Sequence, residues 1–277
     1  METSTPYAPP VDRLLAPGEE RARQRPWPDY PAEYGLGAEH IPELIRLATD
    51  MELWFSGGEG PEIWAPLHAW RALGQLRAEA AVEPLLGMLD ELADEDWALE
   101  ELPVVFARIG AAAIPPLAEF LAGSTHALWA RVASTSALEK IAEADPSARE
   151  AVVAALTRQL GKWYRQDKLL NAHLIHVLVE LGAREAAPLM EEAFAADRVD
   201  IALRGDWEDV QVDLGLLPER RTVRPPLHPE LEPLASLLRE RLASRPSPGS
   251  SSRPVNQAKA KRKLARQSRK RNRKRKK

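Results

Sequence analysis

LGAREAAPL at residues 181–189 and IGAAAIPPL at residues 109–117 share an apolar-Gly start and a Pro-Leu end at the same spacing. LGQLRAEAAVEPL at residues 73–85 is the same pattern with four residues added. Glycine is favoured just after the last turn of a helix, and proline is tolerated in the first turn of the next, where its missing N–H has no helical partner. Each stretch therefore predicts a helix end, a short turn and a new helix.

The three stretches recur at a regular interval. Pro84 and Pro116 are 32 positions apart, and Pro116 and Pro188 are 72 apart, which is twice 36. A period in the middle thirties, with one divergent unit around Pro146, predicts a helical solenoid.

Apolar residues between these turns follow the spacing of amphipathic helices. In residues 82–92 and 170–181 they recur at i, i+3, i+4 and i+7, and no convincing alternating strand pattern separates them. We therefore expect an all-α chain. The expected helical segments are a capping helix near 38–53, helix pairs in 61–92, 96–122, 126–163 and 168–196, and a short final helix at 206–214.

At these residues the chain resembles HEAT-repeat proteins, and more narrowly the units called PBS-lyase HEAT-like repeats, over roughly residues 60–197. The phrases YGLGAEHIPELIRLATD, HAWRALGQLRAEAAVEPLL and GDWEDVQVDLGL are also similar to a bacterial HEAT-repeat family, some members of which end in a SEC-C zinc motif. That motif is absent here because the chain has no cysteine. The resemblance implies an α-solenoid of HEAT-like helix pairs, and it implies a scaffold rather than a particular reaction.

Proline and charge divide the chain into four expected regions. Of 24 prolines, seven lie in residues 1–31 and eight between Pro218 and Pro254. We expect a Pro-rich irregular N-terminal extension at 1–35, a HEAT-like helical repeat domain at 36–217, a Pro/Ser-rich linker with one short helix at 218–252, and a polybasic disordered tail at 253–277.

The tail separates the charge of the molecule. Residues 253–277 hold 14 Lys and Arg and no Asp or Glu, so the other 252 residues hold 24 basic and 41 acidic residues, a net charge of −17. A polybasic end can neutralise phosphates of RNA or DNA without reading sequence. The competing interpretations are a solubility tail and an intramolecular strap on the acidic body. The candidate nucleic-acid-binding residues are Lys259, Lys261, Arg262, Lys263, Arg266, Arg269, Lys270, Arg271, Arg273, Lys274, Arg275, Lys276 and Lys277.

Two acidic segments contain tryptophan, DELADEDWALEE at residues 90–101 and GDWEDVQVD at residues 205–213. One interpretation is a solvated loop and a capped terminal helix; the other is an acidic recognition surface for a protein partner, anchored by aromatic rings. The candidate protein-binding residues are Trp97, Asp206, Trp207, Glu208 and Asp209. Trp64, Trp129 and Trp163 also fall on or near successive helices, and we expect most of them in the core.

The sequence offers little support for chemistry. The absence of cysteine excludes disulfides, thiolate zinc sites and cysteine nucleophiles, and no GxSxG, Walker A, GxGxxG or HExxH string occurs. His173 and His176 are interpreted as packing residues rather than metal ligands. We therefore expect a non-enzymatic protein with no cofactor, no metal and no catalytic residue.

The alternative is a lyase-like or nucleic-acid-modifying enzyme, or an enzyme accessory, on the same HEAT-like scaffold, and it requires a groove where carboxylates converge with His or Trp. A body of charge −17 argues against a basic nucleic-acid-binding face, with the local cluster of Lys162, Arg165 and Lys168 as the exception. The chain contains no stretch of 18 apolar residues, which favours a cytoplasmic protein without membrane contact.

Overall fold

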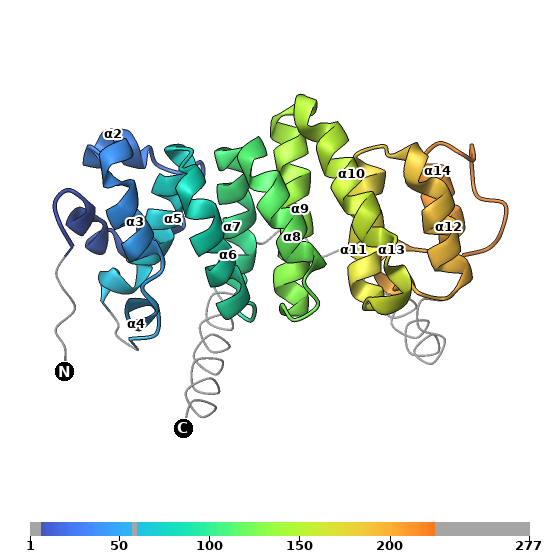
Figure 1. Ribbon diagram of the computed structural model, residues 1–277, viewed down its shortest axis with the longest axis horizontal. Coiled ribbons are helices and arrows are strands. Elements are labelled where there is room, and N and C mark those ends of the chain that lie inside the picture. The colour runs from blue at the N-terminus through green and yellow to red at the C-terminus, as the bar shows by residue number, and fades with distance from the viewer. Residues whose placement is uncertain (1–6, 57–59, 225–277) are drawn as a thin grey trace, which may run out of the picture. The chain divides into compact units, whose positions relative to one another are not determined.

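The computed structural model describes residues 7–56 and 60–224, and within these ranges it contains α-helices, short 3-10 helices and no strand. The predicted all-α class is confirmed. The chain divides into two compact units at Val199 and Asp200. The first unit holds most of the helices, from the blue N-terminal end to α12 in Figure 1. Among the described residues, no single helix could cross a bilayer by length and composition, although Asp96–Ile109 and Ala111–Ala122 pass together as a pair bent by 117°.

The N-terminal segment is more regular than its prolines predict. It forms η1 (Val11–Leu15), α1 (Gly18–Ala22), α2 (Tyr30–Tyr34) and η2 (Ala38–His40). Leu14 and Tyr30 are buried in the core. The expectation of irregular backbone is therefore incorrect for residues 11–15, 18–22 and 30–34, whereas residues 23–29 contain no helix. Proline is compatible with a first helical turn, as at Pro31 of α2, and the apolar residues between the prolines drive the segment onto the protein.

The remaining helices of the first unit lie at the expected places. They are α3 (Ile41–Ala48), α4 (Met51–Trp54), η3 (Pro61–Trp64), α5 (Ala65–Gln75), η4 (Glu79–Ala81), α6 (Val82–Glu91), α7 (Asp96–Ile109), η5 (Ala111–Ala113), α8 (Ile114–Ala122), α9 (Leu128–Ala144), η6 (Pro146–Ala148), α10 (Arg149–Leu160), η7 (Trp163–Arg165), α11 (Lys168–Glu180), η8 (Arg184–Ala186) and α12 (Ala187–Ala195).

Two of the three repeated stretches form the turn that their glycine and proline predict. Gly110 caps α7 at a φ of 98°, and Gly182 follows α11 at a φ of 63°, a region that favours glycine. The third stretch differs, because α5 continues through Gly74 to Gln75 and the left-handed residue is Arg77, at a φ of 52°. A Cβ at Gly74 would lie 3.3 Å from the Cα of Val105. This glycine therefore allows α5 and α7 to approach closely instead of ending a helix.

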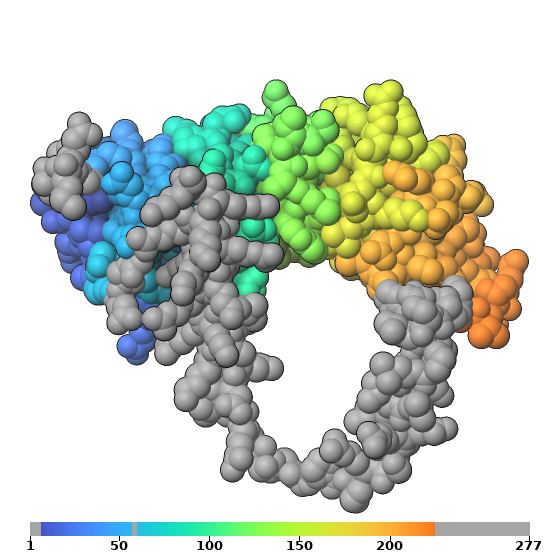
Figure 2. Space-filling view, turned by 90° about the horizontal axis from the view of Figure 1, so that it is seen from below, coloured from blue at the N-terminus to red at the C-terminus, as the bar shows by residue number. Residues whose placement is uncertain are grey.

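The helices of the first unit pack as two rows. The first helices of the pairs contact one another in the order α3, α5, α7, α9 and α11, and the second helices in the order α6, α8, α10 and α12. Figure 2 shows the colours of this unit following one another across the surface in chain order. Leu85 and Leu117, which follow the repeated prolines, are completely buried, whereas the equivalent Leu189 is only half-buried.

The second unit contains α13 (Ile201–Arg204) and α14 (Trp207–Asp213) in its described part, which ends at Arg224. Asp206 caps α14 by accepting a hydrogen bond from the backbone N–H of Asp209 at 3.0 Å. In return, Asp209 Oδ2 accepts from the backbone N–H of Asp206 at 3.1 Å. The two carboxylates thus satisfy the free N–H groups at the start of the short helix.

Candidate functional site

The candidate residues of the basic tail, from Lys259 to Lys277, lie outside the described residues. The other candidates, which come from the two acidic segments, can be placed. Asp206, Trp207, Glu208 and Asp209 lie together at the start of α14, and Trp97 lies in the first unit near the start of α7.

The acidic start of α14 is bound by the chain segment that follows the helix. Arg220 forms a two-pronged pair with Asp206, with Nη–Oδ distances of 2.6 and 2.8 Å. Arg224 Nη2 lies 2.6 Å from Asp209 Oδ1. Glu208 accepts hydrogen bonds from the backbone N–H groups of Arg221 and Thr222 at 2.9 and 3.0 Å. A partner that binds these carboxylates must therefore displace residues 220–224.

These contacts stabilise the ionised carboxylates. The hydrogen bond from Arg220 holds the pKa of Asp206 below its usual value. The hydroxyl of Thr222, with the backbone N–H groups beside it, lowers the pKa of Glu208. Carboxylates of this kind are suited to binding cations and not to donating protons. In this chain, the cations bound to them are Arg220 and Arg224.

The tryptophans occupy different environments. Trp97 is half-buried, with its ring edge-on to Trp64 at 5.2 Å between centroids and the Arg23 guanidinium 5.9 Å from its centre. Trp70 is completely buried and donates to the carbonyl of Ala48 at 2.8 Å. Trp129 is the exposed member, with 47% of its surface accessible. Of the eight tryptophans, only Trp54 and Trp70 are buried in the core, whereas Trp64 and Trp163 are half-buried. The expectation that most of the tryptophans on successive helices lie in the core is therefore wrong.

A cavity of about 400 Å³ lies between the N-terminal segment and α7. Its wall includes Glu101, which is only 1% exposed and pairs with Arg71 through contacts of 2.8 and 2.9 Å. Arg25, from the rim, pairs with the same carboxylate. The ring of Trp27 lies 5.1 Å from the Arg71 guanidinium and 4.9 Å from that of Arg108. Glu101 of α7 therefore joins Arg25 of the N-terminal segment to Arg71 of α5.

The Arg71 and Glu101 pair fastens the N-terminal helices to the repeat helices. Arg71 Nη2 also donates to the carbonyl of Ala22 at 2.6 Å, at the end of α1. Sequence reasoning missed this pair. The available signal was the position of Arg71 four residues after Leu67, which places its charge on the buried face of α5.

The two histidines of α11 lie beside aromatic and acidic side chains of α9. His173 packs against Trp129, with ring centroids 6.3 Å apart, and burial lowers its pKa. His176 Nδ1 is 3.8 Å from Glu180 Oε1, too long for a hydrogen bond. Burial raises the pKa of Glu139, and the charge of a protonated His176 partly opposes this. Within the described ranges, no group of three or more His, Asp or Glu side chains could hold a metal ion.

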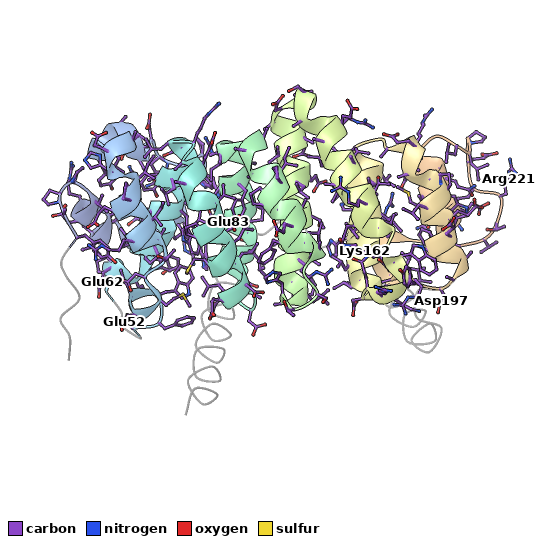
Figure 3. The ribbon with its side chains drawn as sticks, viewed as in Figure 1. Glu52, Glu62, Glu83, Lys162, Asp197 and Arg221 are labelled. Carbon is purple, nitrogen blue, oxygen red and sulfur yellow. The ribbon has the colours of Figure 1, made fainter. Side chains whose placement is uncertain are left out.

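A second cavity, of about 270 Å³, lies between α8 and α10. Pro115, Ala118, Glu119 and Ala122 line one wall, and Ala155, Arg158, Gln159 and Lys162 line the other. Lys162 ends this wall and is labelled in Figure 3. Of the basic cluster seen in the sequence, Lys168 is occupied by Asp197, with Nζ and Oδ2 2.6 Å apart.

Comparison of the chain with protein-family models, with curated proteins and with solved structures finds no match.

Proposed function

We propose that this chain is a non-enzymatic adaptor of the HEAT-like α-solenoid type that works in the cytoplasm. Its helical body binds a protein partner, and its basic tail at residues 253–277 binds RNA or DNA without sequence preference. The two rows of helices and the glycine-proline turns at Gly110 and Gly182 support the solenoid part of the proposal.

The observation that carries the proposal is the separation of charge along the chain. Fourteen cations without a single acid lie in the last 25 residues, and the rest of the chain has a net charge of −17. Cations at this density release counterions from a phosphate backbone, and this release drives binding. The net negative charge of the body disfavours phosphate binding over most of its surface, which leaves that surface free for another partner.

The candidate surface for the protein partner is the acidic start of α14 with Trp207, and Trp97 is a separate candidate in the first unit. Residues 220–224 show which chemistry suits the α14 surface, because two arginines and backbone N–H groups already bind it. We infer that the partner presents arginines in an extended segment and replaces residues 220–224.

Neutralising the tail tests the nucleic-acid part of the proposal. If about six tail cations contact phosphates, the logarithm of the affinity for duplex DNA should fall with the logarithm of salt concentration at a slope near −5. This corresponds to a loss of about a thousandfold between 50 and 200 mM salt. A full-length variant with all 14 Lys and Arg of residues 253–277 changed to Gln should lose this binding. Fluorescence anisotropy measures both quantities.

The thermal melt of the same variant distinguishes two roles of the tail. A tether binds nucleic acid and does not contact the body, whereas a strap binds the acidic body of the same chain. The tail offers few apolar side chains for a core, so a tether should leave the melting temperature unchanged. A strap on the acidic body should lower it. Unchanged affinity and salt slope in the Gln variant would show that the body carries the nucleic-acid site, and the tether proposal would be wrong.

A further inference from the structure

The end of α10 and the turn η7 form a basic region in an otherwise acidic body. No Asp or Glu occurs from Ala151 to Gln166, and this stretch contains Arg158, Lys162 and Arg165. None of these three cations forms an ion pair with a carboxylate of the described residues, whereas the neighbouring Lys168 is paired with Asp197. Three uncompensated charges therefore lie within eight residues.

The first two cations share one side of the helix end. Arg158 lies in the last turn of α10 and Lys162 follows the end of the helix, and both line the cavity between α8 and α10. Lys162 Nζ lies 3.3 Å from the amide oxygen of Gln159, a neutral acceptor that leaves its charge in place. Glu119, on the α8 wall, is an acidic residue of the same cavity.

An exposed aromatic ring lies next to the last of these charges, Arg165. Tyr164 is 53% exposed, the guanidinium of Arg165 is 5.1 Å from its ring centre, and Trp163 meets it edge-on at 5.7 Å between centroids. About half of the Tyr164 side chain is therefore accessible to a ligand.

The backbone that presents Tyr164 is held by a buried network of amide side chains. Gln166 accepts a hydrogen bond from Gln159 Nε2 and donates to Asn171 Oδ1 at 2.8 Å. Its backbone carbonyl accepts from Arg198 Nη2 at 2.6 Å. All three amide side chains are buried. The turn is therefore fixed before any ligand arrives, which reduces the entropy lost on binding.

We propose that Arg158, Lys162, Tyr164 and Arg165, here called the α10–η7 surface, bind single-stranded nucleic acid. The cations neutralise phosphates, and a base stacks on Tyr164. An unpaired base offers the flat face that this ring needs, whereas the bases of a duplex are stacked on each other. An acidic peptide would satisfy the charges but would leave the ring exposed. The inference rests on the proposed nucleic-acid function and adds a contact on the helical body to the one in the tail.

The test uses the full chain with a fluorescent single strand of 12 thymidines and a 12-base-pair duplex. Tyr164→Ala should weaken single-strand binding about tenfold, the loss expected for one stacked base, and should leave duplex binding unchanged. Tyr164→Phe keeps the ring and should stay within about twofold of the parent. Changing Arg158, Lys162 and Arg165 together to Gln should make the salt slope for the single strand shallower by about 2. Arg184→Gln, an exposed arginine on η8, is the matched control and should change neither ligand.

The outcomes distinguish this surface from the tail. If the Tyr164 and triple Gln variants bind the single strand like the parent while the tail-neutralised variant loses binding, the tether stands and the α10–η7 inference is wrong. If the tail variant is unaffected but Tyr164→Ala is weakened, the tether fails and the surface stands. Specific binding of a poly-glutamate peptide or of anionic vesicles, lost in the triple variant without any effect on the single strand, would also overturn the inference.

Photocrosslinking gives a measurement that needs no substitution. A single strand containing 5-bromouracil, irradiated with the unaltered full chain, should attach to the tryptic peptide of residues 163–165, which follows Lys162 and ends at Arg165. Crosslinks confined to residues 253–277 would contradict the assignment.

Discussion

Replacing Glu101 by Gln should lower the free energy of unfolding by about 3–5 kcal/mol, because it leaves the completely buried Arg71 without its charged partner. The carboxylate also pairs with Arg25, so the change removes the negative charge from a site that holds two cations. Urea unfolding followed by circular dichroism measures the loss.

Glu19→Gln is the matched control, because Glu19 pairs with Arg23 on the surface of α1 one helical turn away. Exposed pairs of this kind contribute about 0.2–1 kcal/mol. The double variant Arg71→Met with Glu101→Leu should recover much of the stability lost in Glu101→Gln, since it leaves no completely buried charge without a partner; Arg25, which also pairs with Glu101, is half exposed and stays solvated. If Glu101→Gln costs no more than Glu19→Gln, Glu101 is not an anchor for the N-terminal helices.

The helices and most of their turns follow from local sequence. Amphipathic spacing and the glycine-proline stretches are visible within about ten residues, and Gly110 and Gly182 occupy the turns that they predict. Gly74 shows where this reasoning fails. Its role depends on Val105, which is distant in sequence and approaches only after α5 and α7 have packed.

The N-terminal segment and its anchor required contacts that no local pattern contains. Proline frequency predicts irregular backbone, but the tendency of Leu14 and Tyr30 to be buried is stronger than this preference. The pairing of Arg71 with Glu101 joins residues 30 positions apart. A charged residue on the buried face of a helix predicts a partner without identifying it.

The sequence shows which charged residues make up the candidate surfaces, but it does not show which partners those residues contact in the fold. The sequence shows that Asp206, Glu208 and Asp209 are clustered, but the chain must reverse after α14, through Gly215 at a φ of 66°, to place Arg220 against them. Similarly, Lys162, Arg165 and Lys168 look equivalent in the sequence. The ion pair of Lys168 with Asp197 shows that they are not.

Acidification should destabilise the protein through His68. This residue of α5 is completely buried against the N-terminal segment. Its Nε2 lies 3.1 Å from the carbonyl oxygen of Gly18, which can only accept, so this nitrogen carries the proton. Its Nδ1 then accepts a hydrogen bond from the hydroxyl of Tyr30 at 2.7 Å. Burial is the main cause that lowers the pKa of His68 to about 4; the charges of Arg71 and Arg21 act in the same direction, whereas the Gly18 carbonyl opposes them.

The direction of the pH effect on stability follows from the pKa of His68 in the folded and unfolded states. In the unfolded chain His68 has a pKa near 6.5, so between pH 6.5 and 4 the unfolded state binds the additional proton and the folded state does not. Stability from this group is therefore complete above about pH 6.5 and is lost as the pH falls towards 4. A depression of this size corresponds to about 3 kcal/mol.

His68→Gln isolates this contribution, since a glutamine amide does not titrate in this range. The parent should lose about 3 kcal/mol more than His68→Gln between pH 7 and pH 4, as measured by urea unfolding at both values. Other groups cancel in this comparison, including His173, whose lowered pKa acts in the same direction, and Glu139, whose raised pKa acts in the opposite one. Because His173 is only half-buried, His173→Gln should show a smaller difference of the same sign. If the parent and His68→Gln lose equal stability, His68 protonates as readily in the folded protein as in the unfolded chain, and the hydrogen bonds to Gly18 and Tyr30 do not fix its neutral form.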